Sequence, residues 1–399
     1  MYKILCSVFI LFSTFELNAQ YKNDNVLYKT VYPEDLAQQL KANPGYLFLD
    51  VRSKGENQDT SYMQSMNIGH LRNAKNIDIR ELATRLNELQ RFKNTPIFVY
   101  CSHSQRSRRA SKILADSGFT NVYNINGGMT TLVQHEYGLN SLYETKDNYK
   151  LLSPSEFCSQ KNSFILDVRP DSSYNAVTTS ELTNSIGKIK SAVHIPFLSL
   201  ENSLPTIPRD KKIVVIDEFG DESIKAASFL STKGYKNVAV LFDGMYNLIT
   251  TNTAELSCKN EVWQQNRKYH ILTSDEFNEM LRKNSDVAII DTRKSDEFKN
   301  QSKDYWKNTG HIKNAVNIPD SALQSRLTEI APYKNKPVVV YSFGGSPEAY
   351  KSAATLVDNG FTNVSILSGG IFTLRWKAAN IKGKSALKDW VTDIPAENL

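Results

Sequence analysis

Short apolar runs alternate with longer amphipathic segments along most of the chain. The runs at residues 97–100 and 213–216 have the length and the β-branched and aromatic content of buried strands. The segments at residues 79–92 and 223–233 have the apolar spacing of helices. This alternation predicts an α/β protein built from parallel sheets that carry helices on both faces.

The pattern occurs three times, with a period of about 120 residues. A strand ending in Asp-x-Arg is followed by a Gly-x-x-x-x-Ala phrase, and later by a Gly-aromatic-x-Asn-Val phrase that leads to a glycine turn. A period of this length corresponds to a domain rather than a solenoid repeat. The three phrases occupy residues 50–52, 167–169 and 291–293, then 69–74, 187–192 and 310–315, then 118–122, 234–238 and 360–364.

We therefore expect a signal peptide followed by three tandem domains. Lys3, an apolar core at residues 4–12 and a cleavage-like end at Ala19 are typical of a secretory signal. The apolar core is too short for a stable membrane span, so the protein is expected to be exported, to the periplasm or the medium. The expected ranges are 1–20 for the signal peptide and 21–145, 146–258 and 259–399 for the domains.

Composition and charge narrow the classes of function. The net charge of +6 is spread without a long Lys/Arg block, so no nucleic-acid partner is expected. Cys6 leaves with the signal peptide, which leaves Cys101, Cys158 and Cys258. Cys158 and Cys258 either pair or stay free, because the sequence does not fix their distance. The cysteines and histidines form no metal-binding spacing, and no metal or organic cofactor is expected.

The stretch from Cys101 to Ser107 carries the candidate chemistry. It lies between the strand at 97–100 and a segment with helical spacing that ends near Gly118. Backbone N–H groups at such a turn point inward and, with the helix dipole, form an anion site. A thiolate there is stabilised, and Arg106 adds positive charge. The sequence thus predicts a nucleophilic sulfur at a strand end.

The corresponding loops of the other two units differ. Asp217 takes the cysteine position in the second unit, where the loop is acidic and is expected to repel an anion. Ser342 takes it in the third unit, without an evident base, and the segment from there to the Gly-aromatic phrase is one residue longer. We expect both units to be inactive in sulfur chemistry and to serve as structural or partner-binding domains.

With these phrases the chain resembles the rhodanese family of sulfurtransferases, over all three units. The resemblance implies that Cys101 accepts a sulfane sulfur and becomes a persulfide held by the loop amides. The Arg-Ser pair that ends the loop matches the family, whereas Ser104 stands where many members have Gly, and serine adopts a positive φ only at a cost. The expected anion-binding residues are Ser102, His103, Ser104, Gln105, Arg106 and Ser107.

Other conspicuous residues have structural interpretations. Asp50 and Arg52 have counterparts in units that lack the cysteine, which favours a structural role, as a strand-end hydrogen bond or ion pair. His70 is replaced by lysine in the second unit, so a local packing or turn role is favoured over proton transfer. Arg108 and Arg109 are interpreted as surface charges that attract anions. His103 either polarises the sulfur or is simply an exposed loop residue.

Three functions are weighed. The leading hypothesis is an exported enzyme that moves sulfur from thiosulfate or a persulfide to cyanide, a thiol or a protein through Cys101. The second is a non-enzymatic binding or scaffold protein. A phosphatase ranks low, because four residues rather than five separate Cys101 from Arg106. The leading hypothesis requires a sulfur that is open to solvent and not locked in a disulfide.

Overall fold

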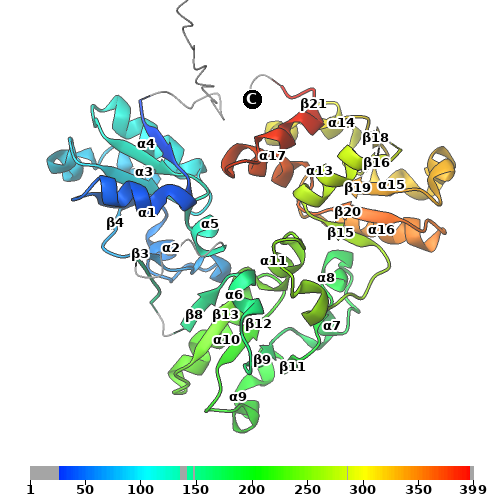
Figure 1. The fold of residues 1–399 in the computed structure, drawn as a ribbon, viewed down its shortest axis with the longest axis horizontal. Helices are drawn as coiled ribbons and strands as arrows, with labels where there is room; N and C mark the ends of the chain where they lie inside the picture. The colour runs from blue at the N-terminus through cyan, green and yellow to red at the C-terminus, as the bar shows by residue number, and fades with distance from the viewer. Residues whose placement is uncertain (1–26, 135–141, 147–148, 285, 396–399) are drawn as a thin grey trace, which may run out of the picture.

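The computed structural model describes residues 27–134, 142–146, 149–284 and 286–395. The expected signal peptide lies outside the described residues. Within them, three five-stranded parallel sheets follow one another along the chain, each flanked by helices (Figure 1). Among these residues no helix combines the length and apolar character needed to cross a bilayer. The α/β fold with three tandem parallel-sheet units is confirmed.

The first unit has the strand order β1-β6-β5-β2-β4, and the antiparallel pair β3-β7 closes it. Its strands are β1 (Lys29–Val31), β2 (Leu47–Asp50), β3 (His70–Leu71), β4 (Lys75–Asn76), β5 (Ile97–Tyr100), β6 (Val122–Ile125) and β7 (Tyr143–Glu144). Its helices are α1 (Pro33–Ala42), α2 (Lys54–Asn57), η1 (Gln64–Met66), α3 (Ile79–Leu82), η2 (Leu86–Phe92), α4 (Gln105–Asp116) and α5 (Gly128–Gln134).

The second unit repeats this order as β8-β13-β12-β9-β11, with β10 and β14 as the antiparallel pair. Its strands are β8 (Tyr149–Leu152), β9 (Phe164–Asp167), β10 (Lys188–Ile189), β11 (Val193–His194), β12 (Ile213–Ile216), β13 (Val238–Leu241) and β14 (Trp263–Gln264). Its helices are α6 (Pro154–Cys158), α7 (Asp171–Tyr174), α8 (Glu181–Ser185), η3 (Phe197–Ser199), α9 (Leu200–Ser203), η4 (Leu204–Thr206), α10 (Asp221–Thr232), α11 (Gly244–Thr250) and α12 (Lys259–Val262). Strand β14 follows the expected boundary at residue 258, yet it pairs within this unit.

The third unit has the order β15-β20-β19-β16-β18 and the antiparallel pair β17-β21. Its strands are β15 (His270–Leu272), β16 (Ala288–Asp291), β17 (His311–Ile312), β18 (Val316–Asn317), β19 (Val338–Tyr341), β20 (Val364–Leu367) and β21 (Val391–Thr392). Its helices are α13 (Ser274–Lys283), α14 (Ser295–Phe298), η5 (Tyr305–Lys307), α15 (Asp320–Leu323), η6 (Gln324–Tyr333), α16 (Pro347–Asp358), α17 (Gly370–Asn380) and η7 (Ser385–Trp390).

The Asp-x-Arg phrase forms the same buried ion pair in each unit. In the first unit, Arg52 Nη2 lies 2.7 Å from an Asp50 carboxylate oxygen and also donates to the Gly69 carbonyl at 2.8 Å. A Cβ on Gly69 would lie 2.3 Å from the Glu144 carbonyl of β7, which explains the glycine of the second phrase. The structural role expected for Asp50 and Arg52 is confirmed. The expected packing role of His70 fits its place on β3, 3.2 Å from Glu144.

One expected helix is broken. Residues 79–92 form α3 and the 3-10 helix η2 instead of one continuous helix. The Thr84 hydroxyl donates to the Glu81 carbonyl at 2.9 Å, so the side chain competes with the backbone for that acceptor.

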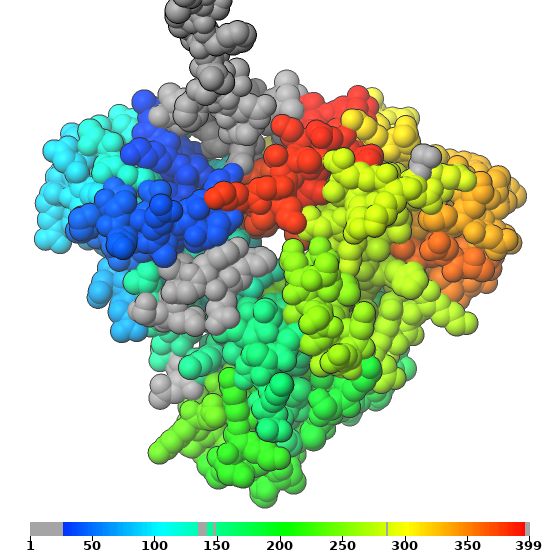
Figure 2. All heavy atoms as spheres, viewed as in Figure 1, coloured from blue at the N-terminus to red at the C-terminus, as the bar shows by residue number. Residues whose placement is uncertain are grey.

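The three units occupy the corners of a triangle, with α5, α11 and α17 toward its centre (Figure 1). Gln134 at the end of α5 donates to Asn247 of α11 at 3.0 Å. The end of the third unit abuts the first, as the red and blue surfaces in Figure 2 show, and Lys382 pairs there with Asp35 at 2.9 Å. A disulfide between Cys158 and Cys258 settles the pairing that the sequence left open.

Candidate active site

The chain between β5 and α4 folds tightly around the sulfur of Cys101. The N–H of Ser104 donates to Sγ at 3.1 Å, and the thiol lies 3.6 Å from Ser107 Oγ. The N–H of Met129, in the first turn of α5, donates to the Cys101 carbonyl at 2.9 Å. A Cβ on Gly128 would lie 2.4 Å from that same carbonyl, so the glycine turn lets α5 press against the loop. The sequence places this sulfur correctly between strand and helix.

Ser104 adopts the backbone conformation that serine disfavours. Its φ is 95°, and the second unit has Gly220 at φ 93° in the corresponding position before α10. The hydroxyl compensates by binding the turn after β6: it donates to Asn126 Oδ1 at 3.0 Å and accepts from the Gly127 N–H. Ser104 therefore reproduces a glycine loop with the help of a side-chain hydrogen-bond network.

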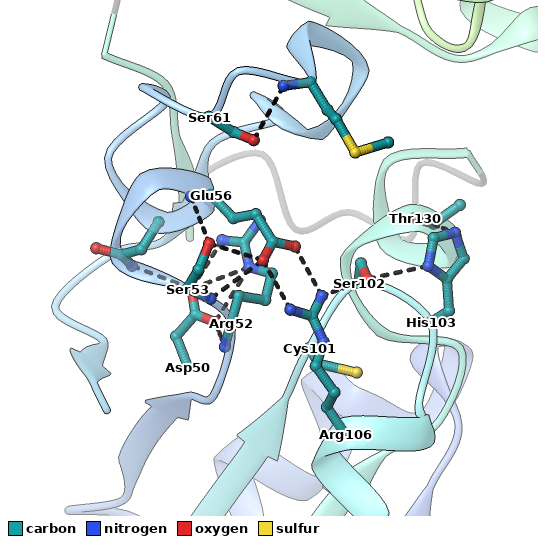
Figure 3. Close-up of polar contacts among 12 residues, drawn as sticks. Asp50, Arg52, Ser53, Glu56, Ser61, Cys101, Ser102, His103, Arg106 and Thr130 are labelled. Atoms are coloured by element: carbon teal, nitrogen blue, oxygen red, sulfur yellow. Dashed lines mark hydrogen bonds and ion pairs between the residues drawn. The ribbon is translucent and has the colours of Figure 1, made fainter. Parts of the chain in front are cut away.

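Arg106 forms a two-pronged ion pair above the loop. Its two terminal nitrogens each lie 2.7 Å from a carboxylate oxygen of Glu56, and one also donates to Ser102 Oγ at 2.8 Å (Figure 3). Burial alone would raise the pKa of Glu56, but Arg106 and the hydrogen bonds from Ser53 outweigh it and bring that pKa to about 2. The pair is ionised at every physiological pH.

The remaining loop side chains face outward or bind one another. His103 Nδ1 lies 2.9 Å from Ser102 Oγ and its Nε2 lies 3.2 Å from Thr130 Oγ1. Desolvation of the ring by the loop, together with the charge of Arg106, lowers the pKa of His103. Gln105 is exposed at the first turn of α4. His103 is thus a neutral hydrogen-bonding residue at neutral pH.

The sulfur is not open to solvent, and that expectation was wrong. Cys101 is 1% exposed, because the loop and the first turn of α5 enclose it. It is nevertheless the free thiol among the described cysteines. A donor therefore reaches Sγ only when part of this enclosure moves. The side chain of Arg106, next to the loop, is 31% exposed.

The second unit shows the same loop with its donors already taken by a carboxyl group; burial raises the pKa of Asp217, and its hydrogen bonds to the loop oppose that rise. The Asp217 carboxylate accepts from the N–H groups of Gly220 and Glu222, both at 2.7 Å. It also accepts from the N–H and hydroxyl of Ser223, at 3.1 and 3.0 Å. That this acidic loop repels an anion from outside stays a prediction. Its amides do point inward, and they bind the loop's own Asp217.

The third unit has a serine in the place of the sulfur. Ser342 is buried and shares a hydrogen bond with the Ser346 hydroxyl. Trp306 packs edge-on against the ring of Phe343, the next loop residue, at 5.2 Å between centroids. The second residue of the following helix is Glu348, as it is Glu222 in the second unit, whereas the first unit has Arg106 there. At this position a positive charge accompanies the cysteine loop, and a negative charge follows each of the other two loops.

Of the two arginines expected on the surface, Arg109 is exposed and Arg108 is not. Arg108 donates to Asn126 Oδ1 at 2.7 Å and to Asn380 Oδ1, in the third unit, at 3.3 Å. The turn of α4 that carries Arg108 faces α17 of the third unit, a contact that helical spacing in one unit cannot reveal. Sequence reasoning also missed Glu56, although a Ser53-x-x-Glu56 capping box directly after Arg52 signalled a helix there.

A family model of the rhodanese-like domain matches residues 32–135, 151–250 and 273–378. A tRNA uridine(34) hydroxylase of Wigglesworthia glossinidia brevipalpis is 33% identical over 106 residues, which cover 26% of this chain and 30% of that protein. The Bacillus subtilis (strain 168) protein YqhL is 42% identical over 60 residues, which cover 15% of this chain and 46% of YqhL. The chain thus spans less than half the length of these relatives.

Two solved structures match the chain at low overall similarity. A thiosulfate sulfurtransferase from Pseudomonas aeruginosa is 16% identical with a TM-score of 0.23, covering 86% of this chain and 66% of that one. A rhodanese with anions from E. coli is 29% identical with a TM-score of 0.18, covering 21% of this chain and 88% of that one. Because the family model covers most of the length in three consecutive matches, the chain belongs to the rhodanese-like domain family.

Proposed function

We propose that this protein is a sulfurtransferase with one working site, in which Cys101 carries the sulfur. The Cys101 thiolate attacks the outer sulfur of thiosulfate or of a persulfide donor, forming a new S–S bond. The old S–S bond breaks, and sulfite or a thiolate leaves with its electron pair. Cyanide, a thiol or a protein thiolate then attacks the outer sulfur of the Cys101 persulfide and restores the thiolate.

The observation that carries this proposal is Asp217 in the second unit. An aspartate oxygen is two bonds from Cβ, as is the outer sulfur of a cysteine persulfide. The carboxylate of Asp217 fills a cradle of three N–H groups and one hydroxyl. The first unit offers the same loop, with Ser107 in the place of Ser223, around a cysteine. An anionic persulfide on Cys101 therefore finds a cradle of the kind that the second unit displays.

Arg106 explains the preference for an anionic donor. Its guanidinium lies at the mouth of the loop, where Glu56 holds it in the closed arrangement (Figure 3). An incoming thiosulfate competes with the Glu56 carboxylate for the same two nitrogens. Exchange of one anion for the other keeps Arg106 paired while the sulfur becomes accessible. Gln105 and His103, on the outer side, contact the donor only by hydrogen bonds.

The alternative is a binding or scaffold protein without catalysis. The burial of Cys101 favours it, as does the absence of a cysteine from the other two loops of the described chain. In both proposals the second and third units, around Asp217 and Ser342, are inactive in sulfur chemistry. The two proposals differ in whether Cys101 ever carries a second sulfur.

We also propose that the protein is exported. Lys3 and the apolar core before Ala19 support a signal peptide. The disulfide between Cys158 and Cys258 independently favours an oxidising compartment, where such bonds persist. The proposed partners are small sulfur anions or persulfides and a thiol or protein acceptor.

The test measures thiocyanate formed from thiosulfate and cyanide by the wild-type protein, Cys101→Ser and Ser342→Ala. We expect product from the wild type and Ser342→Ala and none from Cys101→Ser. Mass spectrometry of the thiosulfate-treated protein should find one added sulfur on the peptide that contains Cys101. Equal product from all three proteins, or an unmodified Cys101 peptide, would refute the transfer mechanism, and the second result would favour the scaffold.

A further inference from the structure

The loop around Cys101 needs support that its own sequence does not supply. Ser104 directs its N–H at Sγ from a φ of 95°, a conformation in which a side chain is strained. In the second unit, glycine takes this conformation freely. A serine in this place relaxes toward negative φ unless neighbouring groups hold it, and relaxation would turn its N–H away from the sulfur.

The support comes from the turn after β6. Ser104 Oγ donates to Asn126 Oδ1 at 3.0 Å, and Asn126 is fully buried. In the second unit, where glycine precedes the helix, the residue corresponding to Asn126 is the apolar Phe242. The amide is therefore present in the unit whose loop has a serine and absent from the unit whose loop has a glycine.

Asn126 is in turn fixed by the third unit. Its Nδ2 donates at 2.8 Å to the carbonyl of Asn380, the last residue of α17. Arg108, from α4, donates at 2.7 Å to Asn126 Oδ1 and at 3.3 Å to Asn380 Oδ1. Asn380 has no exposed surface. A continuous chain of hydrogen bonds thus runs from the third unit through Asn126 and Ser104 to the sulfur.

We propose that Asn380 is a positioning residue for Cys101, through which the third unit holds the sulfur-binding loop of the first unit in its working shape. This inference rests on the proposed function, because it assigns a role to the loop in sulfur chemistry. It also gives the third unit a task that its own Ser342 loop does not require. The docked end of α17 orders Asn126 and Arg108, and these order Ser104.

The test follows the reactivity of Cys101 toward iodoacetamide as a function of pH, read by mass spectrometry of the Cys101 peptide in the full-length protein. Asn380→Ala keeps the backbone carbonyl that accepts from Asn126 and removes the side-chain oxygen that accepts from Arg108. It should slow alkylation at pH 7 by about fivefold and move the pH midpoint upward, because Arg108 then holds Asn126 less firmly and a misplaced Ser104 N–H no longer stabilises the thiolate. Asn380→Asp keeps the acceptor for Arg108 and should stay within about twofold of the wild type.

Repeating Asn380→Ala in a protein that carries Ser104→Gly shows whether the substitution acts through the position of Ser104 or through packing in general. In the Ser104→Gly protein, adding Asn380→Ala should cost no further reactivity relative to Ser104→Gly alone, because glycine holds a positive φ unaided. Lys382→Ala removes the exposed ion pair with Asp35 at the same interface and serves as the matched control. It should leave the pH profile unchanged.

Three results would overturn the inference. The first is an unchanged pH profile of Cys101 alkylation in Asn380→Ala. The second is a loss of reactivity from Asn380→Ala that is as large in the Ser104→Gly protein as in the wild type. The third is a shift of the pH profile in Lys382→Ala as large as that in Asn380→Ala. If Asn380→Ala fails to fold, Asn126→Ala in the two backgrounds provides the same comparison. Alkylation needs no sulfur donor, so a protein that makes no thiocyanate but shows these shifts would refute the proposed transfer and leave the positioning role standing.

Discussion

The loops of the first and second units have the same backbone shape but differ in the residue that they surround. Gly220 and Ser104 both precede a helix at φ near 95°, and both loops direct N–H groups at the residue after the strand. In the second unit that residue is Asp217, whose carboxylate uses the donors permanently. In the first unit it is Cys101, a free thiol whose sulfur accepts from the Ser104 N–H. The difference shows that the fold supplies the cradle and that one side chain decides whether it is available.

The largest expected effect on activity comes from placing an aspartate in the first loop, as in the second unit. Cys101→Asp should lower thiocyanate formation by more than about 1000-fold, because the nucleophile is lost. Its melting temperature should equal or exceed that of Cys101→Ala, because the carboxylate satisfies the loop donors as Asp217 does. A Cys101→Asp protein that is less stable than Cys101→Ala would show that the two cradles are not equivalent.

The second effect concerns the positive charge of Arg106 beside the Cys101 loop. Arg106→Glu introduces the residue type found at Glu222 and Glu348, beside Glu56. We expect kcat/KM for thiosulfate to fall by about 100-fold, mainly through KM, because an anion no longer finds a positive partner. Arg109→Glu, exposed on the same helix, is the matched control and should cost less than about threefold. Equal losses would indicate long-range attraction instead of a local contact.

The third effect is a pH dependence of stability that belongs to the second unit. Burial, and then the charges of Asp217 and Asp221, raise the pKa of Asp243 to about 7, above its value of 3.8 in the unfolded chain. The folded protein therefore binds a proton more tightly, and the stability present below pH 4 is lost as the pH rises to 7. Asp243→Asn should leave the free energy of unfolding nearly unchanged at pH 4 and raise it by about 4 kcal/mol at pH 8.

Urea unfolding at both pH values measures this difference. Asn retains the size of the side chain and tolerates the left-handed conformation of Asp243, whose φ is 52°. An equal change at pH 4 and pH 8 would mean that the substitution acts through packing and not through the charge.

The smallest effect is expected at His103. Its lowered pKa leaves the ring neutral above pH 6.5, so it contributes hydrogen bonds and not charge. His103→Gln should change kcat/KM by less than about threefold between pH 6.5 and pH 8. Loss, in the variant, of an acidic inflection that the wild-type pH profile shows would instead assign His103 a proton-transfer role.

Sequence patterns predicted what depends on neighbours along the chain. The three sheets followed from short apolar runs, and the role of Asp50 and Arg52 followed from their presence in units without a cysteine. The position of Cys101 between β5 and α4 was also correct. These features are encoded within a few residues of one another, in strand periodicity and in the turn that follows.

The features that were missed depend on distant segments. Glu56 is 50 residues from Arg106, and Asn380 is 272 residues from Arg108. No local periodicity records such contacts, and for the same reason Arg108 was assigned to the surface. The closure over Cys101 also depends on the Arg106 rotamer and on α5, which a motif does not specify. The pairing of Cys158 with Cys258 required their distance, which only the packed chain provides.

The bridge between Cys158 and Cys258 constrains how the working thiol can be maintained. It joins residues 100 positions apart and closes a loop that contains almost the whole second unit, which a chain-entropy estimate values at about 4 to 5 kcal/mol. A reductant that rescues an oxidised Cys101 also attacks this tether, and both bridge cysteines are only partly buried. If Cys101 carries sulfur as proposed, a general thiol reductant that repairs it would also threaten the bridge between Cys158 and Cys258, whereas one selective for Cys101 would spare it.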